Sequence, residues 1–178
     1  TDSMIVGKAN IVKNNLRTIV FGNEIDASNN TQNSLLIGRK HKEKTGKQNL
    51  TVGEVNIITT TRNNITGVTS NEITDGSANL IQGKENIIVS NKNSIAIAKE
   101  NNLNNNDSVG TIGTNNSINN ISNNSLVTGD SNTENGGLND IVYGSSNNSI
   151  TNQNTITGGV SNTTTSNQKS ILIGDNNA

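Results

Sequence analysis

The sequence predicts an all-β protein, built as a parallel β-solenoid of about twelve coils that are each close to 15 residues long. Two observations carry this prediction. Short aliphatic units that end in a small residue recur along the whole chain, and they recur at a nearly constant interval. The closing positions of the units are 7, 22, 38, 53, 67, 83, 98, 113, 129, 144, 159 and 174. A disordered tract has no reason to keep such an interval.

Composition alone favours the opposite interpretation, a disordered low-complexity chain. Of the 178 residues 38 are Asn, only 29% are hydrophobic and 1% aromatic, and Pro, Cys and Trp do not occur. The apolar residues are not scattered, however, and their regular spacing indicates a repeat protein. The absence of cysteine excludes a disulfide scaffold, and no apolar run approaches the ~18 residues that a membrane-spanning helix needs.

Charge and histidine content argue against two function classes. The 13 basic residues are balanced by 14 acidic ones, which disfavours electrostatic binding of nucleic acid. His41 is the only imidazole, and nucleophilic catalysis usually pairs a nucleophile with a base. We therefore expect no enzyme activity, no catalytic residues, no cofactor and no metal site.

The main unit of each coil is expected to be a β-strand. The residues alternate as apolar, any, apolar and then a small residue, and many of the apolar ones are β-branched. The closing glycine suits a turn that a Cβ would obstruct. In chain order the units span residues 4–7, 19–22, 35–38, 50–53, 65–67, 80–83, 95–98, 109–113, 126–129, 141–144, 156–159 and 171–174.

A second and weaker apolar position follows several of the closing residues. It is occupied by Ile11, Ile57, Ile87, Leu103, Ile118 and Ile150. Each coil should therefore hold two short strands and two turns. The one exception that we expect is the dense basic run over residues 39–47, which should replace the second strand of its coil with a loop.

The alternation also predicts which side chains are buried. We expect the first and third residues of the main unit, such as Leu35 and Ile37, to face inward, and Phe21 and Tyr143 to pack inside with them. The middle residue, such as Leu36, is often apolar as well, and a strand that is apolar on both faces is normally buried on both. A partner chain is the simplest cover, so we predict a homo-oligomer whose axis runs along the rod.

Three units carry a resemblance to a known family. Asn33-Ser34-Leu35-Leu36-Ile37-Gly38, Asn93-Ser94-Ile95-Ala96-Ile97-Ala98 and Ser170-Ile171-Leu172-Ile173-Gly174 are similar to the head repeat of trimeric autotransporter adhesins. The resemblance covers nearly the whole chain, although Ala98 replaces the usual glycine and the unit at 109–113 is irregular. It implies a YadA-like head, in which three chains each form a left-handed parallel β-roll around one axis.

The resemblance also implies a function, a place and partners. Residues 1–178 would be one adhesin head domain, without the stalk or the membrane anchor of the family, exposed at the outer membrane of a Gram-negative bacterium. As a homotrimer it would bind a host surface glycoprotein, such as one of the CEACAM (carcinoembryonic-antigen) type, or a matrix protein such as collagen, fibronectin or laminin. It would touch the membrane only through a C-terminal anchor that this chain lacks.

Five residues are candidates for receptor contact. Arg62 and Thr61 lie together on a predicted turn, and exposed arginine is favoured as an interface anchor. Arg39, Lys40 and Lys42 belong to the basic run, which a trimer would repeat three times as a positive belt.

Two other function classes compete with the adhesin. A tailspike-type or other solenoid that binds or degrades polysaccharide would need paired acids at the same position of successive coils. An ice-binding solenoid would need aligned Thr-x-Thr ranks, and the pairs Thr59/Thr61 and Thr155/Thr157 do not recur from coil to coil.

Overall fold

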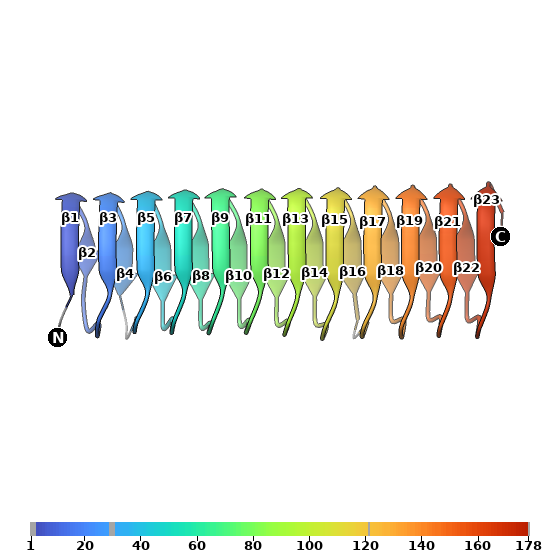
Figure 1. Ribbon diagram of the computed structural model, residues 1–178, viewed down its shortest axis with the longest axis horizontal. Coiled ribbons are helices and arrows are strands. Elements are labelled where there is room, and N and C mark those ends of the chain that lie inside the picture. Colours follow the sequence, from blue (N-terminus) through green and yellow to red (C-terminus); the bar gives the residue numbers. More distant parts are fainter. Residues whose placement is uncertain (1–2, 29–30, 121, 178) are drawn as a thin grey trace.

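The computed structural model describes residues 3–28, 31–120 and 122–177, which form a straight rod of stacked coils (Figure 1). Every coil contributes one strand to each of two parallel sheets, so the predicted β-solenoid is confirmed. The described residues contain no helix, and so none that could cross a membrane. The chain makes eleven full turns and ends on a twelfth strand of the first sheet.

The first sheet has twelve strands, which we call the main strands. They are β1 (Met4–Lys8), β3 (Ile19–Asn23), β5 (Leu35–Arg39), β7 (Leu50–Glu54), β9 (Ile65–Thr69), β11 (Leu80–Lys84), β13 (Ile95–Lys99), β15 (Gly110–Thr114), β17 (Leu126–Asp130), β19 (Ile141–Ser145), β21 (Ile156–Val160) and β23 (Ile171–Asp175).

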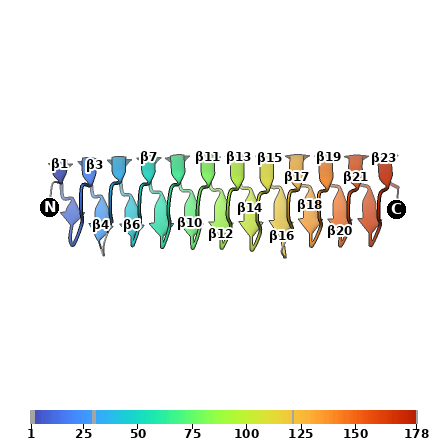
Figure 2. The same ribbon diagram turned by 60° about the horizontal axis from the view of Figure 1, so that its bottom comes forward.

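The second sheet has eleven shorter strands, which we call the second strands; they lie behind the first sheet in Figure 1 and come into view below it in Figure 2. They are β2 (Ile11–Val12), β4 (Asp26–Ser28), β6 (Lys42–Lys44), β8 (Ile57–Thr59), β10 (Glu72–Thr74), β12 (Ile87–Val89), β14 (Asn102–Asn104), β16 (Ser117–Asn119), β18 (Thr133–Asn135), β20 (Asn148–Ile150) and β22 (Thr163–Thr165).

The register stacks equivalent residues of successive coils directly on one another. Leu35 pairs with Leu50 and Leu50 with Ile65, and the same in-register pairing continues along both sheets. A third column of single β-bridges links the turns that follow the second strands, as between Lys47 and Arg62. Side chains of one kind therefore form ranks along the rod, about 4.8 Å apart.

The prediction of which side chains face inward is wrong. The second residue of the main strand, which is the middle residue of the predicted aliphatic unit, is buried and its neighbours are not: Leu36 is 0% exposed, whereas Ile37 is 37% exposed and Leu35 half-buried. Phe21, expected inside, is also 37% exposed on the outer face, and Tyr143 is half-buried there. Alternation with a period of two defines two faces but does not say which is inner when both are apolar.

The core fills the narrow space between the two sheets. It is built from the second residues of the main strands, the middle residues of the second strands, Ile25 just before β4, and Val109 just before β15. Its buried apolar members are Val20, Ile25, Ala27, Leu36, Ile58, Ile73, Ile81, Ile88, Ala96, Leu103, Val109, Ile118, Val127 and Val142. All of them except Ile58 fall into two clusters, separated near β6 and β7, where the interior residues Glu43 and Thr51 are polar.

A ladder of asparagines closes the interior beside the second strands. It occupies one position in nine successive coils: Asn56, Asn71, Asn86, Asn101, Asn116, Asn132, Asn147, Asn162 and Asn177. At Asn101 the side-chain Nδ2 donates to the carbonyls of Ile97 (3.0 Å) and Gly113 (2.7 Å), and the Oδ1 accepts from the backbone N–H of Asn116 (3.2 Å). The side chain thus satisfies backbone groups that the turn leaves unpaired.

Asparagine has a second use in the turns. Asn63, Asn93 and Asn115 have φ values of 55°, 51° and 54°, in the left-handed region. Among residues with a Cβ, Asn enters that region most readily. The turns and the ladder together account for a composition that by itself resembles disorder.

Candidate functional site

The outer face of the twelve-stranded sheet is apolar. Its two ranks are the first and third residues of the main strands, and many are large hydrophobic side chains that stay exposed. They include Met4, Val6, Ile19, Phe21, Ile37, Val52, Ile65, Ile95, Ile112, Leu126, Ile141, Ile171 and Ile173. We call this surface the apolar face. It runs the length of the rod, and contiguous apolar patches of that extent are uncommon on soluble monomers.

The outer face of the eleven-stranded sheet differs in character. Its ranks mix charged and amide side chains with isolated apolar ones, as Lys42, Ile57, Glu72, Ile87 and Asn102 show in five successive coils. Single exposed apolar residues on a polar surface are ordinary. Only the twelve-stranded sheet therefore offers a continuous apolar surface.

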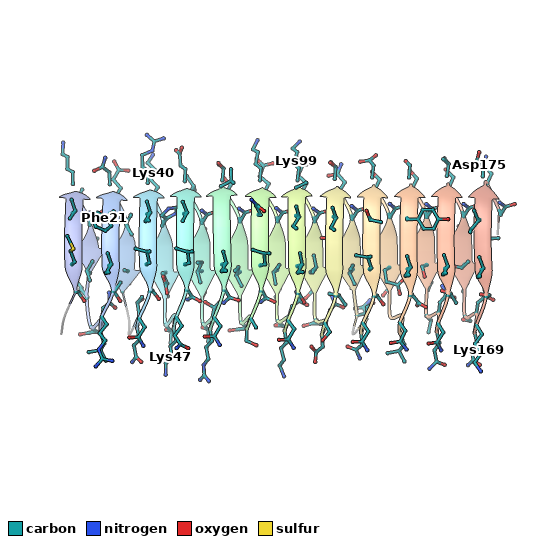
Figure 3. The ribbon with its side chains drawn as sticks, in the orientation of Figure 1. Phe21, Lys40, Lys47, Lys99, Lys169 and Asp175 are labelled. Atoms are coloured by element: carbon teal, nitrogen blue, oxygen red, sulfur yellow. The ribbon has the colours of Figure 1, made fainter. Side chains whose placement is uncertain are left out.

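The turns that follow the main strands form one long edge, which we call the upper edge. It carries Lys40, Lys99 and Asp175 (Figure 3). Between described residues, four ion pairs lie along this edge: Arg39–Glu54, Lys40–Glu24 at 3.9 Å, Lys84–Glu85 at 3.0 Å and Lys99–Glu100 at 2.6 Å. All eight side chains are well exposed, so each pair contributes little to stability.

The turns that follow the second strands form the opposite edge, the lower edge, which carries Lys47 and Lys169 (Figure 3). In the column of β-bridges along this edge Lys47 pairs with Arg62, Arg62 with Ser77, and Ser77 with Lys92. In the part of the chain that the structure describes, none of these three cations lies in an ion pair. The ion pairs of the described residues thus lie along the upper edge, whereas these three cations of the lower edge form none, although Asp107 follows Lys92 in the same column of β-bridges.

The basic run does not form the predicted loop. Lys42, Glu43 and Lys44 form β6, a regular second strand, and the Glu43 side chain occupies the core position. Arg39 and Lys40 consequently lie on the upper edge, Lys42 points outward from β6, and Lys47 lies on the lower edge. A single basic belt is thus ruled out, since the coil divides the run among three surfaces.

The other two candidate residues are neighbours with different environments. Arg62 is exposed on the lower edge. Thr61 is 1% exposed, and its hydroxyl oxygen accepts a hydrogen bond from Nδ2 of Asn49 at 3.0 Å. The structure therefore leaves Arg62 available for contact and places the Thr61 hydroxyl in the interior, out of reach of a receptor.

His41 takes the place of asparagine at the start of the ladder. Its Nδ1 accepts from the backbone N–H of Asn56 (3.3 Å), and its Nε2 lies 2.9 Å from the Ile37 carbonyl oxygen. These partners require a neutral ring with the proton on Nε2. Burial lowers the pKa of His41, against a smaller opposing effect of the hydrogen bond to Ile37. The ring has a structural position and is not part of the basic surface.

Replacing His41 with asparagine should extend the ladder by one coil and change how stability depends on pH. The folded protein resists protonating His41, so the wild type loses stability as the pH falls below about 6.5, the ordinary histidine value. We expect H41Q and H41N to lack that component, with H41N the more stable. Urea unfolding at pH 7.5 and 5.0 measures how much stability each protein loses in acid. A loss in both variants identical to that of the wild type would contradict the role assigned to His41.

Sequence reasoning missed two groups of buried acids. Glu43 accepts hydrogen bonds at Oε1 from Ser34 (2.8 Å) and Asn49 (2.9 Å), and burial raises its pKa. Glu134 and Asp140 are both 0% exposed and lie against Gly137, where a Cβ would overlap an oxygen of each. Counting one coil on from Ile118 would have placed Glu134 in the core, because the two are register partners.

The Glu134–Asp140 pair is enclosed by the coils. Burial, and to a lesser extent the neighbouring Asp140, raise the pKa of Glu134 to about 7. Across residues 3–28, 31–120 and 122–177, no three His, Asp or Glu side chains gather closely enough to hold a metal ion. The pair is thus a buried feature of the core and offers no surface to a polymeric substrate.

No protein-family model matches the chain, and a comparison with curated proteins finds no significant match. Function must therefore be inferred from the surfaces themselves.

Proposed function

We propose that this chain is the head of a trimeric bacterial surface adhesin, in which three rods pack their apolar faces around a common axis. The observation that carries the proposal is the apolar face, which extends over all twelve main strands. An apolar face of this extent is stabilised when partner chains bury it. The similarity of the repeat to YadA-like heads supports three chains. The same similarity supports a left-handed roll and display at the outer membrane.

The size of the apolar face fits a stable interface. Twelve strands at about 4.8 Å spacing and five residues of about 3.3 Å rise give a surface of roughly 50 by 15 Å. That is on the order of 800 Å² per chain, which is what a partner in a standard protein interface buries. A parallel, in-register rod also presents the same rank at every level, so cyclic symmetry can repeat one contact along the whole length.

Binding would then use the surfaces that remain outside. These are the two edges and the polar face of the eleven-stranded sheet, which carry mainly amide, hydroxyl and charged groups. Three identical copies on one axis convert weak single contacts into strong attachment through avidity. A polysaccharide-degrading solenoid is the weaker alternative, because the Glu134–Asp140 pair is fully buried.

Charged substitutions on the apolar face should dissociate the trimer. The variant I37D/I112D places carboxylates on two exposed residues of the apolar face, and I57D/I87D makes the same change on the opposite sheet. The four isoleucines are matched in exposure, at 37%, 45%, 37% and 40% respectively. We expect light scattering to give three times 18.7 kDa for the wild type and for I57D/I87D, and the monomer mass for I37D/I112D.

A monomeric wild type with a β-type circular dichroism spectrum would refute the trimer, as would equal dissociation of both double variants. The adhesion step is tested separately, by binding to immobilised collagen, fibronectin, laminin and a CEACAM-type ectodomain. Wild type should bind at least one of these surfaces far more strongly than the monomeric variant does. Absence of binding to all of them would leave the trimer standing and remove the proposed receptors.

A further inference from the structure

The lower edge carries a cluster of cations in register, which we call the basic cluster: Lys47, Arg62 and Lys92. Lys47 and Arg62 lie in adjacent coils, and Lys92 follows two coils after Arg62 in the same column of β-bridges. At about 4.8 Å for each coil the three Cα atoms span roughly 14 Å along the rod. The row is fixed by the backbone, since Lys47 N–H donates to Thr61 (2.9 Å) and Arg62 N–H to Gly76 (3.1 Å).

A groove opens between Arg62 and Lys92. It is lined by Thr60, Arg62, Asp75, Gly76, Ser77 and Lys92. The groove exists because the intervening coil contributes only small side chains at Gly76 and Ser77, while Arg62 and Lys92 extend on either side. Two cations about 10 Å apart along the rod thus flank a shallow surface that can admit part of an extended ligand.

The chemistry of the groove combines cations with hydroxyl and carboxylate groups. Among the described residues Arg62 and Lys92 have no ion-pair partner, although Asp75 lines the same groove and Asp107 is the β-bridge partner of Lys92 in the next coil. Guanidinium and ammonium groups bind carboxylate or sulfate. Asp75 can accept hydrogen bonds from sugar hydroxyls, and the hydroxyls of Ser77 and Thr60 can both donate and accept them.

We infer that the basic cluster binds a linear acidic glycan, with one carboxylate or sulfate held between Arg62 and Lys92. The inference deepens the proposed function by naming a class of partner. It rests on that proposal for its biological setting, but the groove lies within a single chain and does not require the trimer. In the assembled head the groove would occur three times.

The test compares two double variants that remove the same charge from opposite edges. R62Q/K92Q alters the groove, and K84Q/K99Q removes two exposed lysines of the upper edge. The probe is a size-defined heparin oligosaccharide, measured by calorimetry at several salt concentrations, with neutral dextran as the blank. We expect at least a tenfold loss of affinity for R62Q/K92Q and less than a twofold change for K84Q/K99Q.

A third variant separates shape from charge. S77L keeps every cation but fills the groove with a branched side chain, and it should also weaken heparin binding at least fivefold. No binding by the wild type, equal losses in the two charge variants, or unchanged binding by S77L would each overturn the inference. Competition by a DNA single strand at the same charge concentration would also overturn it, by showing a general affinity for polyanions.

Failure of the glycan site can be distinguished from failure of the proposed function, because light scattering first gives the molar mass, and so the oligomeric state, of each sample. A monomer that binds heparin through the groove would remove the trimer and keep the glycan site. A trimer that binds matrix protein but not heparin would keep the adhesin and remove the glycan site.

Discussion

Replacing Asn101 with leucine is expected to lower the free energy of unfolding by about 3 to 6 kcal/mol. Asn101 lies in the middle of the asparagine ladder and is 0% exposed. Leucine would strip hydrogen-bond partners from the carbonyls of Ile97 and Gly113 and from the N–H of Asn116. Each backbone group left unsatisfied in the interior costs about 1–3 kcal/mol. Urea unfolding followed by circular dichroism measures the loss.

The adjacent residue provides the control. Asn102 begins β14 and is exposed, so N102A should change stability by no more than about 0.5 kcal/mol. The variant N101D keeps the shape of the side chain but directs a carboxylate at two carbonyl oxygens. It should be strongly destabilised at pH 7 and partly recover in acid, when the carboxyl is protonated and can donate again. Equal effects of N101L and N102A would show that the ladder does not hold the coils together.

Removing the charge of Glu134 is expected to flatten the pH dependence of stability between about pH 4.5 and 7. The folded pKa of Glu134 is about 7, raised mainly by burial. The unfolded chain releases this proton near 4.5 and the folded one only near 7, so stability is highest below 4.5 and falls as the pH rises through 7. A difference of that size corresponds to about 3 kcal/mol.

Two variants measure this contribution. E134Q keeps a polar side chain without the ionisation, and E134I copies Ile118, the register partner of Glu134 in the preceding coil. At pH 8 both should unfold at higher urea concentration than the wild type, and the advantage should shrink at pH 4.5. His41 and Glu43 are the same in all three proteins, so their titration cancels. If stability depends on pH in E134Q as it does in the wild type, the titration of Glu134 is not the cause of that dependence.

The repeat could be derived from the sequence because it depends on local rules. The main strands begin at the first residue of the predicted unit in every coil but the irregular one at 109–113, where β15 begins one residue later at Gly110. Each main strand ends one residue past the predicted closing position, except β9, where Val68 takes the register position of the closing glycine that the sequence places at Gly67. The second strands were less marked. Glu43 and Glu134 occupy core positions that polarity assigns to the surface, and the uniform coil length overrides that preference.

The candidate site was only partly predictable. The sequence predicts Arg62 as an isolated exposed cation, and Arg62 does lie exposed on the lower edge. Its relation to Lys92 was not visible, because residues thirty apart become neighbours only once the coils stack. The basic run at 39–47 looked like one cluster because its residues are close in the sequence, and the coil separates them.

The sequence by itself determined the class of fold, the number of coils and the positions of the turns, because each follows from the 15-residue interval and from the residues that permit tight turns. It did not determine which face is inside. That was decided by the cross-section of the roll, which accepts only one inward side chain near the middle of each strand and often a small one, as at Ala96 and Thr66. The larger aliphatic pairs are therefore turned outward, and they form the apolar face on which the proposed assembly depends.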